Sequence, residues 1–298
     1  MSAAQPIVSV ALPLALAFIM FYLGTTLRVD DFRQVLRRPR ALSLGLAGQL
    51  LLVPSVGFPV ARGGGLEASM AIGLMVLAAC PGGVSAGLLT HLARGDVALS
   101  IVLTAVSSVV AMATLPLMLD LSLRAFADST LQIDLPLAQT VRRIFLLTTV
   151  PVAVGMVARA WRPALAECLE PVAGRIATML FVLIVLATFW SQRDVLWQHL
   201  PTVGAACAVL NVLVLSIAWA ASRAARLGHR DAVAVATECG LQNSALGIYV
   251  TVELLRQPAL SVPSVVYALL MNAGAIVFVL LMRRSGRRDG AWGAHGAL

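Results

Sequence analysis

The stretch CPGGVSAG at residues 80–87 lies in the middle of an apolar run that would otherwise form one continuous membrane helix. Proline removes a hydrogen bond from a helix and paired glycines loosen it, so we expect a break near the middle of the bilayer. For this stretch alone, a simple kink is the alternative. A second stretch, TECGLQNS at residues 237–244, places a carboxylate, two carboxamides, two hydroxyls and a glycine at similar depth. These two interruptions decide the predicted fold.

The composition indicates a lipid-embedded chain. Of 298 residues, 59% are apolar and 12% are charged, whereas a soluble domain carries about 25% charged residues. The four cysteines are widely spaced and fit neither a disulfide framework nor a zinc site. We therefore predict an all-α polytopic membrane protein with nine transmembrane helices, each close to the roughly 20 residues that span a bilayer core. The predicted spans are residues 6–27, 41–60, 69–92, 97–119, 141–161, 176–190, 202–221, 232–254 and 262–282.

The arginines indicate the orientation of the chain. All 22 basic residues are arginine, and the net charge is +8. Sixteen fall on one side of the predicted membrane, and the other six are Arg62, Arg124, Arg142, Arg143, Arg193 and Arg256. Because positively charged loops stay in the cytoplasm, we predict an N-terminus outside, a cytoplasmic tail at residues 283–298 and no nucleic-acid partner. A basic patch for an anionic partner is the alternative interpretation of residues 283–288.

Glu238 is the acidic residue that lies inside a predicted span. The other 13 acidic residues fall in loops or at span ends. A carboxylate at this depth costs a few kcal/mol on insertion scales, so it marks a candidate functional site. A protonated or hydrogen-bonded structural glutamate is the alternative.

The two interrupted runs occupy matching places in the order of spans. Four spans, one extra span and four further spans follow one another, and each interrupted run is third in its set of four. Because of the extra span, the two sets cross the membrane in opposite directions, as the inverted repeats of secondary transporters do. Freed carbonyls at such breaks bind cations, and exposed helix N-termini bind anions.

An intramembrane enzyme would need a nucleophile with a base, or a pair of carboxylates. The four histidines lie at span ends or in loops, and Glu238 has no second acid within a span. We therefore predict a transporter that is not an enzyme. A channel or sensor with the same fold, and an uncoupled or proton-coupled anion transporter, stay open as alternatives.

At these residues the sequence resembles the bile acid:sodium symporter family, in its bacterial nine-helix form. The resemblance rests on LGTTL at 23–27, on CPGG at 80–83 with THLARGDVALS at 90–100, and on ECGLQNS at 238–244. It implies two discontinuous helices that cross, and a division into core and panel domains. We expect the core around 69–119 and 202–254, and the panel around 6–60, 141–190 and 262–282.

The resemblance also implies sodium as the coupling ion, with no organic cofactor. The ligands that it implies for the second sodium site are Gln49, Glu238, Cys239, Leu241 and Gln242. Its first site implies Ser100, Thr104 and Glu238, with a serine–asparagine pair after the first break. In this sequence that pair is Ala86 and Gly87, with Ser85 one place earlier. We therefore expect a weak or lost first site, and coupling to fewer sodium ions or to a proton on Glu238.

The implied substrate is an organic anion. Asn243, Asn272, Ser85 and the backbone amides after Gly83 are the expected substrate contacts, because amides and helix N-termini bind carboxylates. The composition, rich in alanine and arginine, suggests a GC-rich bacterium and hence its inner membrane. The resemblance also implies small carboxylates such as keto acids or pantoate-like metabolites, which the wider superfamily carries, and for a bacterial protein we expect these at least as much as bile-acid-like substrates. The expected partners are this anion, sodium and the lipid bilayer.

Overall fold

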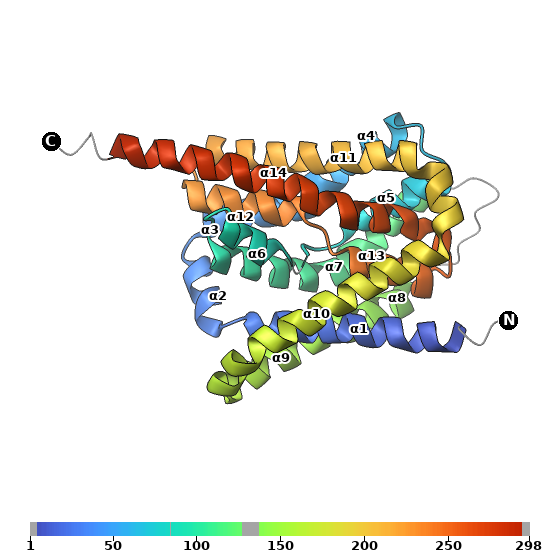
Figure 1. Cartoon of the computed structure of the whole chain (residues 1–298), viewed down its shortest axis with the longest axis horizontal. Helices are drawn as coiled ribbons and strands as arrows, with labels where there is room; N and C mark the ends of the chain where they lie inside the picture. The colour runs from blue at the N-terminus through green and yellow to red at the C-terminus, as the bar shows by residue number, and fades with distance from the viewer. Residues whose placement is uncertain (1–4, 84, 127–136, 294–298) are drawn as a thin grey trace.

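The structure is a computed structural model that describes residues 5–83, 85–126 and 137–293. Within these residues the secondary structure is helical, apart from one antiparallel bridge between Gly82 and Gln242. Most helices run along the long axis of the molecule (Figure 1). The all-α prediction is therefore confirmed for the described residues.

The first half of the chain forms α1 (Gln5–Thr26), α2 (Val29–Leu36), α3 (Pro39–Ala47), η1 (Gly48–Leu52), α4 (Val53–Gly63), α5 (Ala68–Ala79), α6 (Ser85–Leu92) and α7 (Val97–Phe126). The second half forms α8 (Leu137–Ile144), η2 (Phe145–Thr149), α9 (Val150–Trp161), α10 (Pro163–Ser191), α11 (Arg193–Ala224), α12 (His229–Gly240), α13 (Ser244–Tyr249), η3 (Val250–Leu254), η4 (Pro258–Ser261) and α14 (Val262–Gly293).

Six stretches of the described chain are long and apolar enough to cross a membrane. The pair α1 and α2, bent by 73°, adds a seventh if it is counted as one span. The six stretches are Pro39–Gly63, Val97–Phe126, Ala138–Trp161, Pro163–Ser191, Arg193–Ala224 and Pro258–Arg283. The predicted spans 69–92 and 232–254 are each divided between two shorter helices. The nine-span count therefore stays a prediction.

Both predicted helix breaks are present. The helix α5 ends at Ala79, and Cys80 is extended with φ −68° and ψ 150°, as expected for a residue that precedes a proline. The helix α12 ends at Gly240, and Leu241 is extended with φ −117° and ψ 98°. After each break a new helix begins, α6 at Ser85 and α13 at Ser244.

The two breaks bind each other through their backbones. The amide of Gly83 donates to the carbonyl of Leu241 over 2.6 Å, and the amide of Asn243 donates to the carbonyl of Pro81 over 2.8 Å. Buried backbone groups must be paired, and these two bonds satisfy groups that the broken helices leave free. The two discontinuous helices therefore meet inside the bundle (Figure 1).

The helices pack in two groups. One group consists of α1, α9 and α10, and α1 lies against both partners. Close contact between α1 and α9 depends on glycine, because a Cβ on Gly24 would overlap the Val152 carbonyl and one on Gly155 would overlap the Phe21 carbonyl. Small residues allow membrane helices to approach closely in this way.

The second group surrounds the breaks. In it α11 packs against α12 and α14, and α5 packs against α4 and α7. Two segments that we expected in the panel pack chiefly against this second group. The segment 41–60 lies on α5, α7, α11 and α12, and the segment 262–282 lies on α11 and α5.

Candidate functional site

Glu238 lies at the centre of the bundle, with none of its surface exposed. Its carboxylate accepts hydrogen bonds from two hydroxyls of α7, Ser100 Oγ over 3.1 Å and Thr104 Oγ1 over 2.7 Å. Residues four apart share one face of a helix, so α7 presents both hydroxyls together. In the described part of the chain, no cationic side chain compensates this charge. A buried carboxylate needs either a proton or a cation.

Gly82 in the first break lies directly against this carboxylate. A Cβ built on Gly82 would overlap Oε1 of Glu238. The backbone of one broken helix therefore touches the carboxylate carried by the other, and a glycine makes this contact sterically possible.

Two buried glutamines form a second group of polar atoms next to the breaks. Gln49 in η1 donates through Nε2 to the Cys80 carbonyl and to Gln242 Oε1, both over 2.8 Å. Gln242 Nε2 donates to the Cys239 carbonyl over 2.7 Å. The structure thus joins Gln49, Gln242 and Cys239 in one network. Among the described contacts, the hydrogen bonds to Glu238 come from α7, and the glutamines bind each other.

Gln49 Oε1 is buried and has no hydrogen-bond partner. An unpaired carbonyl oxygen in a protein interior is costly. A cation bound beside Gln49 would satisfy this oxygen, so this atom is the clearest sign that the donor set fits a cation.

The residues available suit a hard cation. The described residues include no cluster of three or more histidine, cysteine, aspartate or glutamate side chains that would hold a metal. They supply one carboxylate together with hydroxyl, carboxamide and backbone oxygens. Hard cations favour oxygen ligands of these kinds.

Ala86 and Gly87 contribute no side-chain oxygen to this region. Ala86 is fully buried. A Cβ built on Gly87 would lie 3.4 Å from Cγ1 of Ile101, the residue that follows Ser100 on α7. The nearest neighbour of Gly87 in this direction is therefore an apolar side chain.

A cavity of about 350 Å³ borders the two breaks. Gly83, Ser85, Asn243 and Asn272 all line it, so the structure brings the four expected substrate contacts together. The opposite wall comes from α1 and α10, through Ile19, Tyr22, Ala177, Thr178, Phe181 and Val182. The cavity thus lies between the two packing groups.

The helices α6 and α13 both begin at this cavity. Their first residues, Ser85 and Ser244, line it. Asn243 caps α13 by accepting a bond from the Leu246 amide over 3.0 Å, while Ser244 Oγ is buried and unpartnered. Two positive helix ends and a free hydroxyl at one cavity favour an anion.

A second, more open cavity of about 790 Å³ adjoins the first. The two share Tyr22, Leu88 and Thr178 in their linings. Its acidic side chains are paired. Glu167 lies 2.7 Å from Arg28, and Glu170 lies 3.0 Å from Arg159, measured between the closest oxygen and nitrogen. Together the cavities connect the breaks with the end of the molecule that carries Arg28.

Sequence reasoning missed Tyr22 and Thr178, which line both cavities, and Tyr267, whose hydroxyl bonds the Gly240 carbonyl over 2.9 Å. Tyr267 gave a usable signal, since its hydroxyl lies within an apolar span. Tyr22 and Thr178 gave none, because residues near span ends are ordinarily polar.

The comparisons with known proteins agree with these features. A family model described as the sodium bile acid symporter family matches residues 13–199, more than half of the chain. A probable chloroplast sodium/metabolite cotransporter of Oryza sativa subsp. japonica is 29% identical over 272 residues, covering 91% of this chain and 63% of the rice protein.

An uncharacterized sodium-dependent transporter of Bacillus subtilis is 27% identical over 260 residues, which are 86% of this chain and 78% of that protein. The human ileal sodium/bile acid cotransporter is 25% identical over 240 residues, 80% of this chain and 68% of its own length. The chain therefore spans less than two thirds of the rice relative and more of the other two.

Proposed function

Because the chain belongs to the sodium bile acid symporter family, we propose that it is a secondary transporter that couples the movement of an organic anion to sodium. The observation that carries the proposal is the buried Glu238 beside the two breaks, with the unpartnered oxygen of Gln49 nearby. A cation at this place would neutralise the carboxylate and satisfy that oxygen at the same time.

The proposed sodium ligands are Gln49, Glu238, Gln242 and the carbonyls of Cys239 and Leu241. Their support is the network that joins Gln49, Gln242 and Cys239. We propose that a second ion is bound weakly or not at all. Ser100 and Thr104 remain next to Glu238, but the side of this region formed by Ala86 and Gly87 is apolar.

We propose that the substrate is a small carboxylate held in the 350 Å³ cavity. A preformed cavity with a few convergent polar groups is the usual form of a small-molecule site. Asn243, Asn272, Ser85 and the backbone after Gly83 would bind the carboxylate, with the two helix N-termini favouring its charge. Bound sodium next to the breaks would add positive charge.

Transport would occur by movement of the group α1, α9 and α10 against the rest of the bundle. The cavities lie between these two groups, so a rocking motion would open and close them. We therefore assign α1, α9 and α10 to the panel and the remaining spans, including 41–60 and 262–282, to the core. With the arginine-rich side in the cytoplasm of a bacterial inner membrane, the cavities open inward.

The test is uptake of radiolabelled pyruvate, pantoate and taurocholate into proteoliposomes with an imposed sodium gradient. We expect at least one to accumulate with sodium and not with choline. Glu238→Gln keeps the shape of the side chain but removes its charge, and should lower the sodium-driven rate roughly a hundredfold, the upper end of typical coupling energies. The matched control is Glu67→Gln, at a carboxylate that is 66% exposed.

Retention of sodium-driven uptake by a folded Glu238→Gln protein would refute the assignment of this residue. A pH gradient in choline forms the other arm of the experiment. Accumulation driven by protons alone would favour the proton-coupled alternative, and exchange without accumulation would favour an uncoupled one.

A further inference from the structure

The carbonyl of Gly240, the last residue of α12, is held by side chains from two other helices. Asn211 on α11 donates to this oxygen through Nδ2 over 2.8 Å, and the hydroxyl of Tyr267 on α14 donates to it over 2.9 Å. The same Nδ2 lies 3.2 Å from the Tyr267 hydroxyl oxygen. A backbone carbonyl has two lone pairs, so both acceptor positions of Gly240 are occupied.

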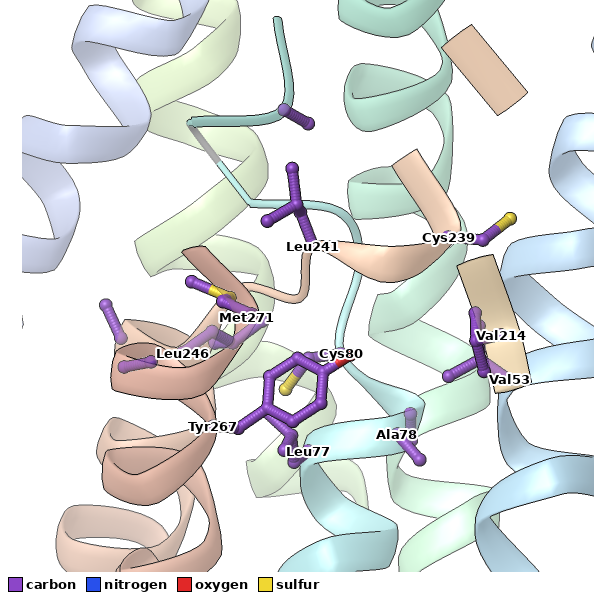
Figure 2. Close-up of a cluster of buried hydrophobic side chains, with 14 of the residues drawn as sticks. Val53, Leu77, Ala78, Cys80, Val214, Cys239, Leu241, Leu246, Tyr267 and Met271 are labelled. Atoms are coloured by element: carbon purple, nitrogen blue, oxygen red, sulfur yellow. The ribbon is translucent and has the colours of Figure 1, made fainter. Parts of the chain in front are cut away.

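The carbonyls on either side of Gly240 are less fully bonded. The Cys239 carbonyl accepts a bond from Gln242 Nε2 over 2.7 Å, and the Leu241 carbonyl accepts one from the Gly83 amide over 2.6 Å. Each therefore has a lone pair to offer. Because Leu241 is extended whereas Gly240 is still helical, the Leu241 carbonyl does not continue the row of aligned carbonyls of α12. Figure 2 shows Cys239 and Leu241 at the end of α12, above the ring of Tyr267.

We propose that Asn211 and Tyr267 are positioning residues for the sodium site. This inference rests on the proposed function. By binding both lone pairs of Gly240, the two side chains fix the carbonyl that is not an ion ligand. The carbonyls of Cys239 and Leu241 then stay directed toward the ion. Without the two donors, the buried Gly240 carbonyl would have to find another partner, and the break would reorient.

The packing holds both donors in place. Asn211 is 2% exposed and Tyr267 is fully buried. A Cβ on Gly274 of α14 would overlap Asn211 Oδ1, and a Cβ on Gly240 would lie 2.6 Å from Leu215 Cγ. Glycine at both places lets α11, α12 and α14 approach closely enough for the three groups to bond.

Asn211 and Tyr267 lie apart from the substrate contacts. Neither is among the described residues that line the 350 Å³ cavity. Their loss should therefore weaken sodium binding and leave substrate binding at saturating sodium nearly unchanged. A residue that only stabilised the fold would produce no such separation.

The experiment measures sodium binding to purified full-length protein by the rise in thermal midpoint as sodium chloride replaces choline chloride. The variants are Asn211→Leu, Tyr267→Phe and the double variant. The control is Ser222→Ala on α11, whose buried hydroxyl bonds only within its own helix, to the Ala218 carbonyl. Proteoliposomes then give the KM at saturating sodium for whichever of pyruvate, pantoate and taurocholate the wild type transports.

We expect the sodium Kd to rise roughly tenfold in the double variant and about threefold in Tyr267→Phe, as expected for lost buried hydrogen bonds. The KM should stay within about twofold of wild type, and Ser222→Ala should match wild type, since its bond is local. If the double variant does not fold, Tyr267→Phe keeps the ring and one donor and still tests the idea.

An unchanged sodium Kd in the folded variants would overturn this inference alone, as would an equal loss of sodium and substrate affinity. A wild-type protein that gains no stability from sodium and shows no sodium-driven uptake would instead overturn the proposed function, and this inference with it.

Discussion

Glu238 places one formal charge inside the bundle, and its surroundings decide how many cations it can hold. Ser100 and Thr104 contribute two hydroxyl oxygens on one side. On the side of Gly87, the apolar side chain of Ile101 is the nearest neighbour, 3.4 Å from a Cβ built on this glycine. Two monovalent cations around a single carboxylate need additional oxygens, because each must replace its hydration shell. We therefore expect one sodium ion for each transport cycle.

The number of coupled ions is testable by sodium titration of uptake. We expect a Hill coefficient close to one for the wild type. Ala86→Ser combined with Gly87→Asn adds two side-chain oxygens, and Ile101→Ala enlarges the space for the new asparagine, whose Cβ would be in van der Waals contact with Ile101 at 3.4 Å. This triple variant should approach a coefficient of two, and Ile101→Ala alone is its control. A wild-type coefficient of two, abolished by Thr104→Ala, would contradict a single-ion site.

Sequence reasoning found the polar residues that are costly to bury, but it missed residues such as Tyr267 that hold the backbone next to them in place. Glu238 and Gln49 stand out because polar groups are rare at membrane depth. That the carboxylate would accept both of its bonds from α7 depends on how α12 and α7 pack, which spacing along the chain does not encode. Tyr267 was missed for a related reason, because its role depends on a backbone carbonyl of another helix.

At the scale of elements, the sequence located both breaks and the family resemblance implied that they cross, but the backbone bonds that join them were not predicted. Pro81 forces the residue before it into an extended conformation, so the end of α5 followed from local chemistry. The antiparallel bridge between Gly82 and Gln242 joins residues 160 positions apart. No local pattern specifies such a pairing, and it follows only from the way in which the two broken helices cross.

Arg38 ties three helices together at the arginine-rich end of the bundle. It precedes α3, and its Nη1 lies 2.8 Å from Asp96 Oδ2 and 3.3 Å from Asp231 Oδ1. Asp96 precedes α7 and bonds the Leu99 amide over 3.0 Å, while Asp231 lies in the first turn of α12. Burial raises the pKa of the Asp231 carboxyl above its ordinary value, Arg38 opposes this shift and Asp96 adds to it.

Arg38→Met should therefore destabilise the protein in a pH-dependent way. A raised folded-state pKa means that the Asp231 carboxyl binds more protons in the folded state than in the unfolded one. The contribution of Asp231 to the free energy of unfolding therefore falls as the pH rises above about 3.9, the pKa of an unperturbed aspartate. Without Arg38 the pKa of Asp231 rises further. We expect roughly 1 kcal/mol lost at pH 7, as for a partly exposed ion-pair network, and less near pH 4.

Thermal unfolding in detergent at both pH values measures this effect. Asp231→Asn introduced into Arg38→Met should recover part of the loss at pH 7, because it removes the charge that has lost its partner. A loss of equal size at both pH values would show that packing of the Arg38 side chain, and not its charge, is responsible.

At the scale of the whole molecule, six or seven of the predicted apolar runs are candidate spans in the described part of the chain, whereas the way in which they pack together could not be derived from any single run. Length and hydropathy are properties of each run, whereas the partner of a run is a property of the bundle. The hydropathy of the segments 41–60 and 262–282 does not distinguish them from the other spans, yet they pack against the broken helices. The wall of the 350 Å³ cavity beside the breaks was therefore predictable, but its opposite wall from α1 and α10 was not.

Thiol labelling tests whether the cavities open toward the cytoplasm. Thr178 lines both of them, so Thr178→Cys in a Cys168→Ser background should react with a membrane-impermeant maleimide in inside-out vesicles. Cys168 must be replaced because it is exposed, whereas Cys80, Cys207 and Cys239 are buried. We expect labelling at least about tenfold slower in right-side-out vesicles, because the cavity is closed on the outer side and a closed site reacts only when the structure opens locally.

The control for this experiment is Asp194→Cys at the start of α11, where the native side chain is 88% exposed. It should show the opposite preference and react in right-side-out vesicles. Labelling of both sites from the same side would contradict either the proposed topology or the inward opening.

The backbone bonds between the two breaks also constrain how the protein is made. The free groups at residues 81 and 83 find their partners at residues 243 and 241, which leave the ribosome much later. At a synthesis rate of about 5–20 residues per second, the first break waits on the order of ten seconds for its partner. During that interval these backbone groups lack the partners that they have in the folded protein, so we expect membrane insertion of the first half to need shielding of the break until the second half arrives.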